Sequence, residues 1–359
     1  MRPALTALTF ALFTPVGFAA DLKVATGDGG SSKVTRKIAA AIDARLSADW
    51  SARQITPAPL ADDHEFCRRV YLDMIGRIPK VAEVRAFADD ADPDKRLKLV
   101  DKLLAKPGYA THFAAAVRAA WLPETISDQF KSFLGIQYED YLRRKLAAGA
   151  SLGAVIRETL TAEVAVGPRG RLNFNNQGGD PDQTALQAFY QALEAKPENL
   201  GSTVTRAFLG VKLECAQCHD HPFAPYKREQ FWQFAAFFGE FTPLPPVGPS
   251  FVGPLQPQYT KNRISVPGLG KGGATRQVSA KYLDGSAPVW KEDRNPRQEL
   301  ADWVLAKDNP YVARNMTNRL WHHFFGVGLI DPIDEPGEAN PPSHPELLDD
   351  LSAAFHAAD

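Results

Sequence analysis

Cysteine, net charge and long apolar runs are what this sequence has least of. Its 359 residues include only 3 cysteines, so two of them within one short stretch form an informative cluster. The formal net charge is −1, which gives no electrostatic case for binding nucleic acid. Beyond the N-terminus, no stretch has the about 18 consecutive apolar residues that a membrane-spanning helix needs. No convincing pair of carboxylates stands out, which argues against an exported polysaccharide hydrolase.

The clustered cysteines belong to the stretch LECAQCHDHPF, residues 213–223. Its Cys-x-x-Cys-His spacing is the attachment signature of c-type haem. Residues three apart share one face of a helical turn, so the thiols of Cys215 and Cys218 can reach one porphyrin edge and each add to a vinyl group. His219 then offers an imidazole nitrogen to the iron. The motif therefore predicts haem c held by Cys215, Cys218 and His219.

Other chemistry fits the same residues. Cys215, Cys218 and either His219 or His221 supply three ligands of a zinc site whose fourth ligand comes from elsewhere. The two thiols also suit a disulfide or a redox pair. His221 separates the interpretations, because a haem site does not need it, whereas a Cys-x-x-Cys-His-x-His metal site would use it. The residues alone leave haem, zinc and thiol chemistry open.

Residues 1–20 have the features of a signal peptide. Arg2 supplies a positive charge, residues 5–13 form a short apolar run, and Ala19 or Ala20 suits cleavage. The run is too short to span a bilayer, and no cysteine lies at the expected cut. We therefore expect a soluble periplasmic or secreted protein with no membrane span after the signal is removed. Covalent haem attachment also takes place outside the cytoplasm, although export permits a disulfide as well.

Apolar residues recur with helical spacing through most of the chain, which predicts a mainly α fold. Residues 33–242 are expected to form a multi-helical domain that contains the cysteine motif. Residues 243–293 are rich in proline and glycine and predict an insertion, partly β, with short strands at 263–266 and 276–282. Residues 294–359 predict a short C-terminal helical segment.

Two predicted helices flank the motif, one over residues 200–213 and one over residues 228–241. The second is dense in aromatic residues, which either wall a porphyrin or form ordinary core. Residues 167–182 predict a long loop rich in glycine and asparagine.

A helix is also expected after Asp62, with Gly76 at its end and Cys67 as a buried free thiol. Arg69, Asp73 and Arg77 follow one another at intervals of four in this helix. They predict a ladder of ion pairs on one face.

A second polar cluster lies on the predicted helix over residues 311–325. Spacings of three and four place its members on one broad face: Asn315, Asn318, Arg319, His322 and His323. One interpretation is a buried hydrogen-bond network. The other makes His322 or His323 a distant iron or metal ligand, with Met316 and His344 as further candidates. An open sixth position on the iron would favour ligand binding or oxidation chemistry over electron transfer.

Several stretches resemble a known family. The chain is similar to the planctomycete-type secreted, cytochrome-associated domain of unknown function, number fifteen-forty-nine, in RVYLDMIGRIP (69–79), LVDKLLAKPGY (99–109) and FLGVKLECAQCHDHPF (208–223). Met74 and Lys106 stand where the family pattern has leucine and serine. NMTNRLWHHFFGVGL (315–329) and PSHPELL (342–348) resemble the start of its usual companion domain.

The resemblance covers most of residues 34–242 and 294–352. It implies an exported protein of the kind often fused to, or encoded with, cytochrome c domains, with no established role. The companion domain normally runs further than residue 359, and the separate cytochrome domain of many relatives has no counterpart in this sequence. With the motif, the resemblance leads us to expect a c-type haem protein that serves electron transfer or a redox step with a redox partner protein. The alternative is a zinc-stabilised binding or scaffold protein, and whether the chain is an enzyme stays open.

Overall fold

The computed structural model describes residues 30–164, 180–241, 262–268 and 275–358. The predicted signal peptide and most of the loop predicted at 167–182 lie outside these residues. The described chain is mainly helical, as the sequence predicts. None of its helices combines the length and apolar character that crossing a membrane requires.

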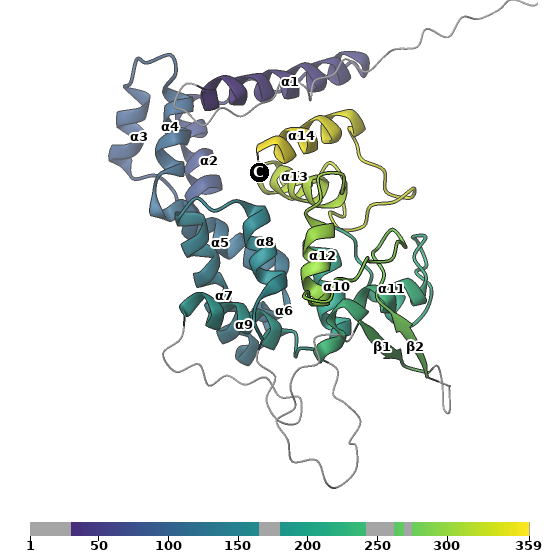
Figure 1. The fold of residues 1–359 in the computed structure, drawn as a ribbon. Helices are drawn as coiled ribbons and strands as arrows, with labels where there is room; N and C mark the ends of the chain where they lie inside the picture. Colours follow the sequence, from purple (N-terminus) through teal and green to yellow (C-terminus); the bar gives the residue numbers. More distant parts are fainter. Residues whose placement is uncertain (1–29, 165–179, 242–261, 269–274, 359) are drawn as a thin grey trace, which may run out of the picture.

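The first part of the chain forms nine helices within the described residues: α1 (Gly30–Ala52), α2 (Asp63–Ile75), α3 (Val81–Ala88), α4 (Lys95–Leu104), α5 (Pro107–Trp121), α6 (Glu124–Ser127), α7 (Gln129–Ala147), α8 (Leu152–Thr161) and α9 (Pro181–Ala192). Figure 1 shows α2, α3 and α4 together at one end of the molecule, with α5 to α9 below them. Helix α1 lies across the top and contacts the last helix of the chain.

The second part carries the cysteine motif and the short sheet. Its elements are α10 (Pro197–Ala207), the 3₁₀ turn η3 (Glu214–Gln217), α11 (Arg228–Ala235), the 3₁₀ segment η4 (Ala236–Phe241), strands β1 (Arg263–Val266) and β2 (Arg276–Ser279), α12 (Pro296–Val304), α13 (Tyr311–Phe325) and α14 (Pro345–Ala358). The strands pair antiparallel, with Ile264 opposite Val278. The predicted insertion therefore does contain a hairpin, with a second strand shorter than expected.

Helix α2 begins and ends as the sequence predicts. The Asp62 side chain accepts a hydrogen bond from the Glu65 amide at 2.8 Å, which caps the first turn. Gly76 ends the helix in the left-handed conformation, with φ at 68°, and its N–H donates to the Leu72 carbonyl. Cys67 is fully buried and free in this helix, also as predicted.

The ion-pair ladder predicted on α2 is wrong. Arg69 pairs with Glu65 one turn earlier, whereas Arg77 lies beyond the end of α2 at Ile75 and makes two hydrogen bonds of 2.9 Å to Glu83. A bidentate arginine–carboxylate pair is stronger than a single contact between two mobile side chains. Asp73 is left partly buried, and this burial raises the pKa of its carboxyl group.

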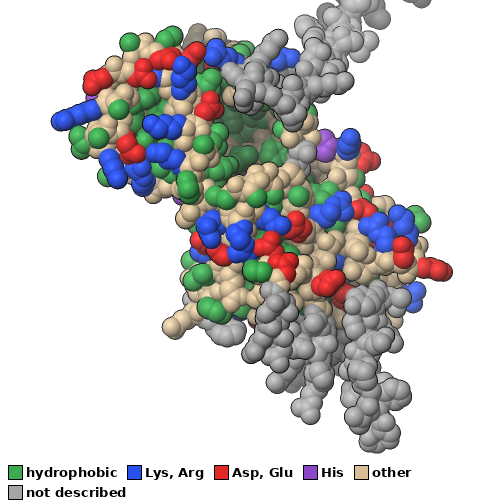
Figure 2. All heavy atoms as spheres, turned by 60° about the vertical axis from the view of Figure 1, so that its left-hand side comes forward, with side chains coloured by type: hydrophobic (Ala, Val, Ile, Leu, Met, Phe, Trp, Pro, Cys, Tyr) green, Lys and Arg blue, Asp and Glu red, His purple; other side chains and the backbone are tan. Residues whose placement is uncertain are grey.

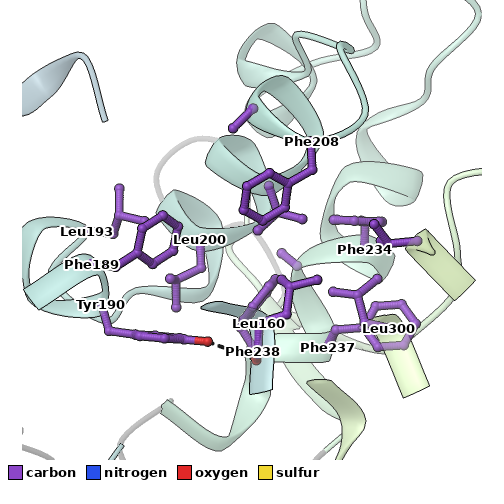
Figure 3. Packing of buried hydrophobic residues seen from close by; sticks show 14 of the residues in the cluster. Leu160, Phe189, Tyr190, Leu193, Leu200, Phe208, Phe234, Phe237, Phe238 and Leu300 are labelled. Atoms are coloured by element: carbon purple, nitrogen blue, oxygen red, sulfur yellow. Dashed lines mark hydrogen bonds between the residues drawn. The ribbon is translucent and has the colours of Figure 1, made fainter. Parts of the chain in front are cut away.

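One large core joins the elements from α5 to α13. It holds buried side chains from the predicted helical domain, from both strands of the predicted insertion and from α12 of the predicted C-terminal segment. The three predicted segments therefore share one core. Figure 3 shows its centre, where Leu160 and Phe238 lie between Tyr190 of α9 on one side and Phe237 and Leu300 on the other. The aromatic residues of 228–241 belong to this core and are at most 6% exposed: Phe231, Trp232, Phe234, Phe237, Phe238 and Phe241. They form core rather than a wall open to a porphyrin.

The surface mixes both signs of charge. Figure 2 shows Lys and Arg side chains interspersed with Asp and Glu on the face in view, around a hollow with apolar side chains in its floor. Intermingled charges of this kind produce no strong field of one sign on that face.

Candidate functional site

The segment that leads into the cysteine motif is not helical throughout. The sequence predicts a helix over residues 200–213, whereas α10 ends at Ala207. Gly210 has φ at +68°, a left-handed conformation that does not continue a right-handed helix. A Cβ on Gly210 would lie 2.6 Å from Oδ1 of Asn315, so glycine is also needed for close approach.

Polar side chains of α13 hold the end of α10. Asn315 donates from Nδ2 to the Ala207 carbonyl at 2.8 Å, and Arg319 donates from Nη2 to the Arg206 carbonyl at 2.9 Å. Arg319 also donates from Nε to Oδ1 of Asn315 at 2.9 Å. Burial lowers the pKa of Arg319 to about 10. These contacts confirm the predicted buried network for Asn315 and Arg319.

Asn318 completes this network toward the following loop. Its Nδ2 donates to the Ile330 carbonyl and its Oδ1 accepts from the Ile330 amide, both at 2.9 Å. Two hydrogen bonds to one residue fix the position of the chain that follows α13. The three polar side chains of α13 therefore tie the end of α10 and the backbone of Ile330 to this helix.

Replacing Gly210 by alanine is expected to lower the free energy of unfolding by about 2 to 4 kcal/mol. Left-handed strain accounts for about 1 to 2 kcal/mol and the contact with Asn315 for the remainder. Gly149→Ala is the matched control, because Gly149 has the same φ but nothing within 4 Å of an added Cβ. Urea unfolding of both variants measures the difference, and equal losses would contradict a close contact at Gly210.

The cysteine turn, residues 214–219, is anchored to the helix that follows it. Ala216, between the two cysteines, is fully buried. The Gln217 carbonyl accepts hydrogen bonds from Nε1 of Trp232 at 3.0 Å and from Nε of Arg228 at 3.2 Å. Both donors come from α11, so the backbone of the turn is fixed to the large core.

The reactive side chains of this turn face outward. Cys215, Cys218 and His219 are exposed, and both thiols are free. Nδ1 of His219 lies 2.7 Å from the Asp220 carbonyl oxygen, so in the tautomer with a proton on Nδ1 it donates there and leaves Nε2 as a free ligand atom. The structure thus presents the three motif residues together on one open turn.

Asp220 links this turn to the start of α11. Its carboxylate accepts from the Arg228 amide at 2.9 Å and pairs with Nζ of Lys227 at 3.0 Å. The Arg228 amide, followed by Lys227, lowers the pKa of Asp220. The Asp220 backbone that meets His219 is therefore held in place by its own side chain.

His221 is used within its own loop. Its Nδ1 accepts a hydrogen bond from the Phe223 amide at 3.2 Å, and its backbone N–H donates to the Tyr226 carbonyl at 2.8 Å. The Phe223 side chain is 82% exposed beside it. Nε2 is consequently the nitrogen through which His221 could bind a metal.

The two histidines of α13 differ in their contacts. Nε2 of His323 lies 2.9 Å from the Asp73 carbonyl oxygen, and its ring centroid is 5.6 Å from that of His112. Nδ1 of His322 is buried with no hydrogen-bond partner among the described residues. In the described part of the chain, no three side chains of His, Cys, Asp or Glu are grouped so that they could hold a metal ion. The roles proposed for His322 and His323 therefore stay predictions.

The two further ligand candidates also have structural roles. Met316 is 5% exposed and belongs to the large core. His344 lies with Nε2 3.4 Å from a carboxylate oxygen of Asp49, where α1 and α14 meet.

The cysteine turn leaves its candidate ligand side chains accessible. Two free thiols and one imidazole are exposed on the same short segment. A zinc site would need four ligands, and among the described residues not even three possible ligands are grouped as a metal ion requires.

Comparison with known protein families gives two matches. Residues 41–242, more than half of the chain, match the family model described as PSCyt2, protein of unknown function (DUF1549). Residues 296–359 match the model described as PSD1, protein of unknown function (DUF1553). No curated protein and no solved structure matches. The matches confirm the resemblance found in the sequence, for the first domain and for the start of its companion.

Proposed function

We propose that this chain, which belongs to the family of the protein of unknown function DUF1549, carries a c-type haem and serves electron transfer or a redox step. One observation carries the proposal: Cys215, Cys218 and His219 are exposed together on a turn whose backbone is anchored to the core. The family model's short name, PSCyt2, is in keeping with an association with cytochromes.

Each motif residue has a distinct task in this proposal. Cys215 and Cys218 would hold the haem through their thiols, and His219 would offer Nε2 to its iron. The Asp220 carbonyl fixes the His219 ring through Nδ1, and such a contact raises the basicity of the ligand nitrogen. When bound, haem supplies one-electron redox chemistry.

The proposal includes export. Residues 1–20 act as a signal peptide, and the protein works in the periplasm or outside the cell, where c-type haem is attached. The partner is then a redox protein that meets the exposed turn. The surface around it carries charges of both signs, from Asp220 and Lys227, that such a partner can complement.

The full chain, produced in a host that matures c-type cytochromes, is expected to be coloured. The haem should survive acid-acetone extraction, because two thioether bonds hold it, and its pyridine haemochrome spectrum should correspond to about one haem per chain. Absorption spectroscopy together with metal analysis of the same sample measures both.

A colourless protein that contains stoichiometric zinc would reject the haem proposal and support the metal-stabilised scaffold. A third outcome is a colourless protein without metal whose exposed thiols react with a thiol-specific reagent only after the protein has been reduced. That outcome would support a disulfide between Cys215 and Cys218.

A further inference from the structure

A cavity of about 660 Å³ lies next to the cysteine turn and is separate from it. One wall comes from residues 209–226, within the first family match, and the other from residues 310–338, within the second. None of the three proposed haem-binding residues lines this cavity. Its volume is in the range of sites that hold small molecules, which often lie where two regions meet.

The amides in the cavity lining are already satisfied. Both amide atoms of Asn315 make hydrogen bonds, to Ala207 and Arg319, and both amide atoms of Asn318 bond to Ile330. A sugar or nucleotide would bring several polar groups that must find partners when they are desolvated. These side chains offer it few, so the cavity disfavours strongly polar ligands.

The remaining lining is mostly apolar and rich in proline and aromatic side chains. Tyr226 and Tyr311 are half-buried, and Phe223 is 82% exposed beside them. Burial raises the pKa of the Tyr226 hydroxyl further above its ordinary value. Pro222 and Pro225 add rigid apolar surface. Aromatic rings of this kind favour stacking with another ring.

Charge in the lining is limited to two residues, Arg314 and Glu338. Arg314 is already ion-paired with Asp349 of α14, and Glu338 is exposed to water. No uncompensated cation is therefore available among the lining residues for an anionic ligand.

We propose that this cavity binds a small, uncharged, flat aromatic molecule of the phenol or quinone class. The ring stacks against Tyr226, Tyr311 and Phe223, and its oxygen stays near the polar rim. The walls belong to the polypeptide itself, so the proposal does not depend on haem. Because Pro222 follows His219 by three residues, a bound molecule lies beside the cysteine turn.

The test titrates the purified full chain with 2-naphthol and follows binding by isothermal calorimetry and saturation-transfer NMR. A molecule of this size is expected to bind with a dissociation constant at or below about 1 mM. Ala224→Trp, which fills the cavity from an exposed loop, is expected to weaken binding at least tenfold. Phe223→Ser is expected to weaken it several-fold through loss of one stacking face.

Two controls make the result specific. Phe133→Ser removes another exposed phenylalanine, 61% exposed on α7 and outside the cavity, and should leave binding unchanged. Cyclohexanol, which has the hydroxyl but no aromatic ring, should bind at least tenfold more weakly than 2-naphthol. The proposal is overturned by absence of 2-naphthol binding, or by equal binding to the wild-type protein and to Ala224→Trp.

Discussion

Replacing Cys215 and Cys218 together by serine is expected to remove all covalently bound haem, while Cys67→Ser leaves the haem content unchanged. The two motif thiols are exposed and free, whereas Cys67 is fully buried in a separate small core. Substitutions at exposed positions change the free energy of unfolding by no more than about 0.5 kcal/mol, so the double variant should fold. Haem staining after denaturing electrophoresis, with urea unfolding of the same samples, measures both effects.

A second pair of variants distinguishes a haem from a metal site that uses both histidines. His219→Ala is expected to remove the axial ligand and change the absorption spectrum, whereas His221→Ala leaves the spectrum unchanged. Nδ1 of His221 accepts its hydrogen bond from the Phe223 amide within the same loop, so this control removes a local contact. Equal effects of the two substitutions would contradict the assignment of His219 as the single protein ligand in the motif.

Much of the fold follows from local sequence signals. Asp62 and Gly76 bound α2 through hydrogen bonds to residues within one turn, so both ends can be predicted. The end of α10 cannot, because it depends on Asn315, more than 100 residues later in the chain. The pairing of Arg77 with Glu83 spans only six residues, but helical spacing does not predict it, because Arg77 lies beyond the end of α2 and Glu83 belongs to α3.

The candidate site likewise combines residues that the sequence identifies with residues that it does not. Cys215, Cys218 and His219 lie within five residues, and their spacing identifies them. The residues that anchor the turn have no such pattern, although Arg228 and Trp232 stand close to it in the sequence. The neighbouring cavity could not be predicted, because its walls lie about 100 residues apart in the sequence and meet through contacts that depend on the fold, such as those of Asn315 and of Lys212 with Glu335.

Glu240→Gln is expected to lower the free energy of unfolding by about 3 to 5 kcal/mol, the usual cost of removing one partner from a buried ion pair. The Glu240 and Arg297 side chains are 4% and 3% exposed and pair directly. Nη1 of Arg297 also donates to the carbonyls of Leu160 and Ala162 and to the Tyr190 hydroxyl, at 2.7 to 3.0 Å. Without Glu240 the guanidinium charge stays buried with no counter-charge.

Arg157→Met is the matched control for this variant. Arg157 of α8 pairs with Asp302 of α12 at 2.6 Å, so it links much the same elements, but its side chain is 46% exposed. An exposed pair of this kind contributes no more than about 1 kcal/mol. A loss at Glu240→Gln that is no larger than the loss at Arg157→Met would contradict a stabilising buried pair.

The pair of Glu240 and Arg297 also provides a test of whether the two family regions fold together. Glu240 lies near the end of the first match and Arg297 at the start of the second, and both border the shared core. If the regions form one cooperative unit, Glu240→Gln shifts a single urea transition that is the same by fluorescence and by circular dichroism. The double variant Glu240→Leu, Arg297→Met should lose less unfolding free energy than the sum of the losses in the two single variants. The reason is that removing both charges leaves neither one unpaired. Two separate urea transitions, or losses of unfolding free energy that add exactly, would show that the second family region does not fold cooperatively with the first.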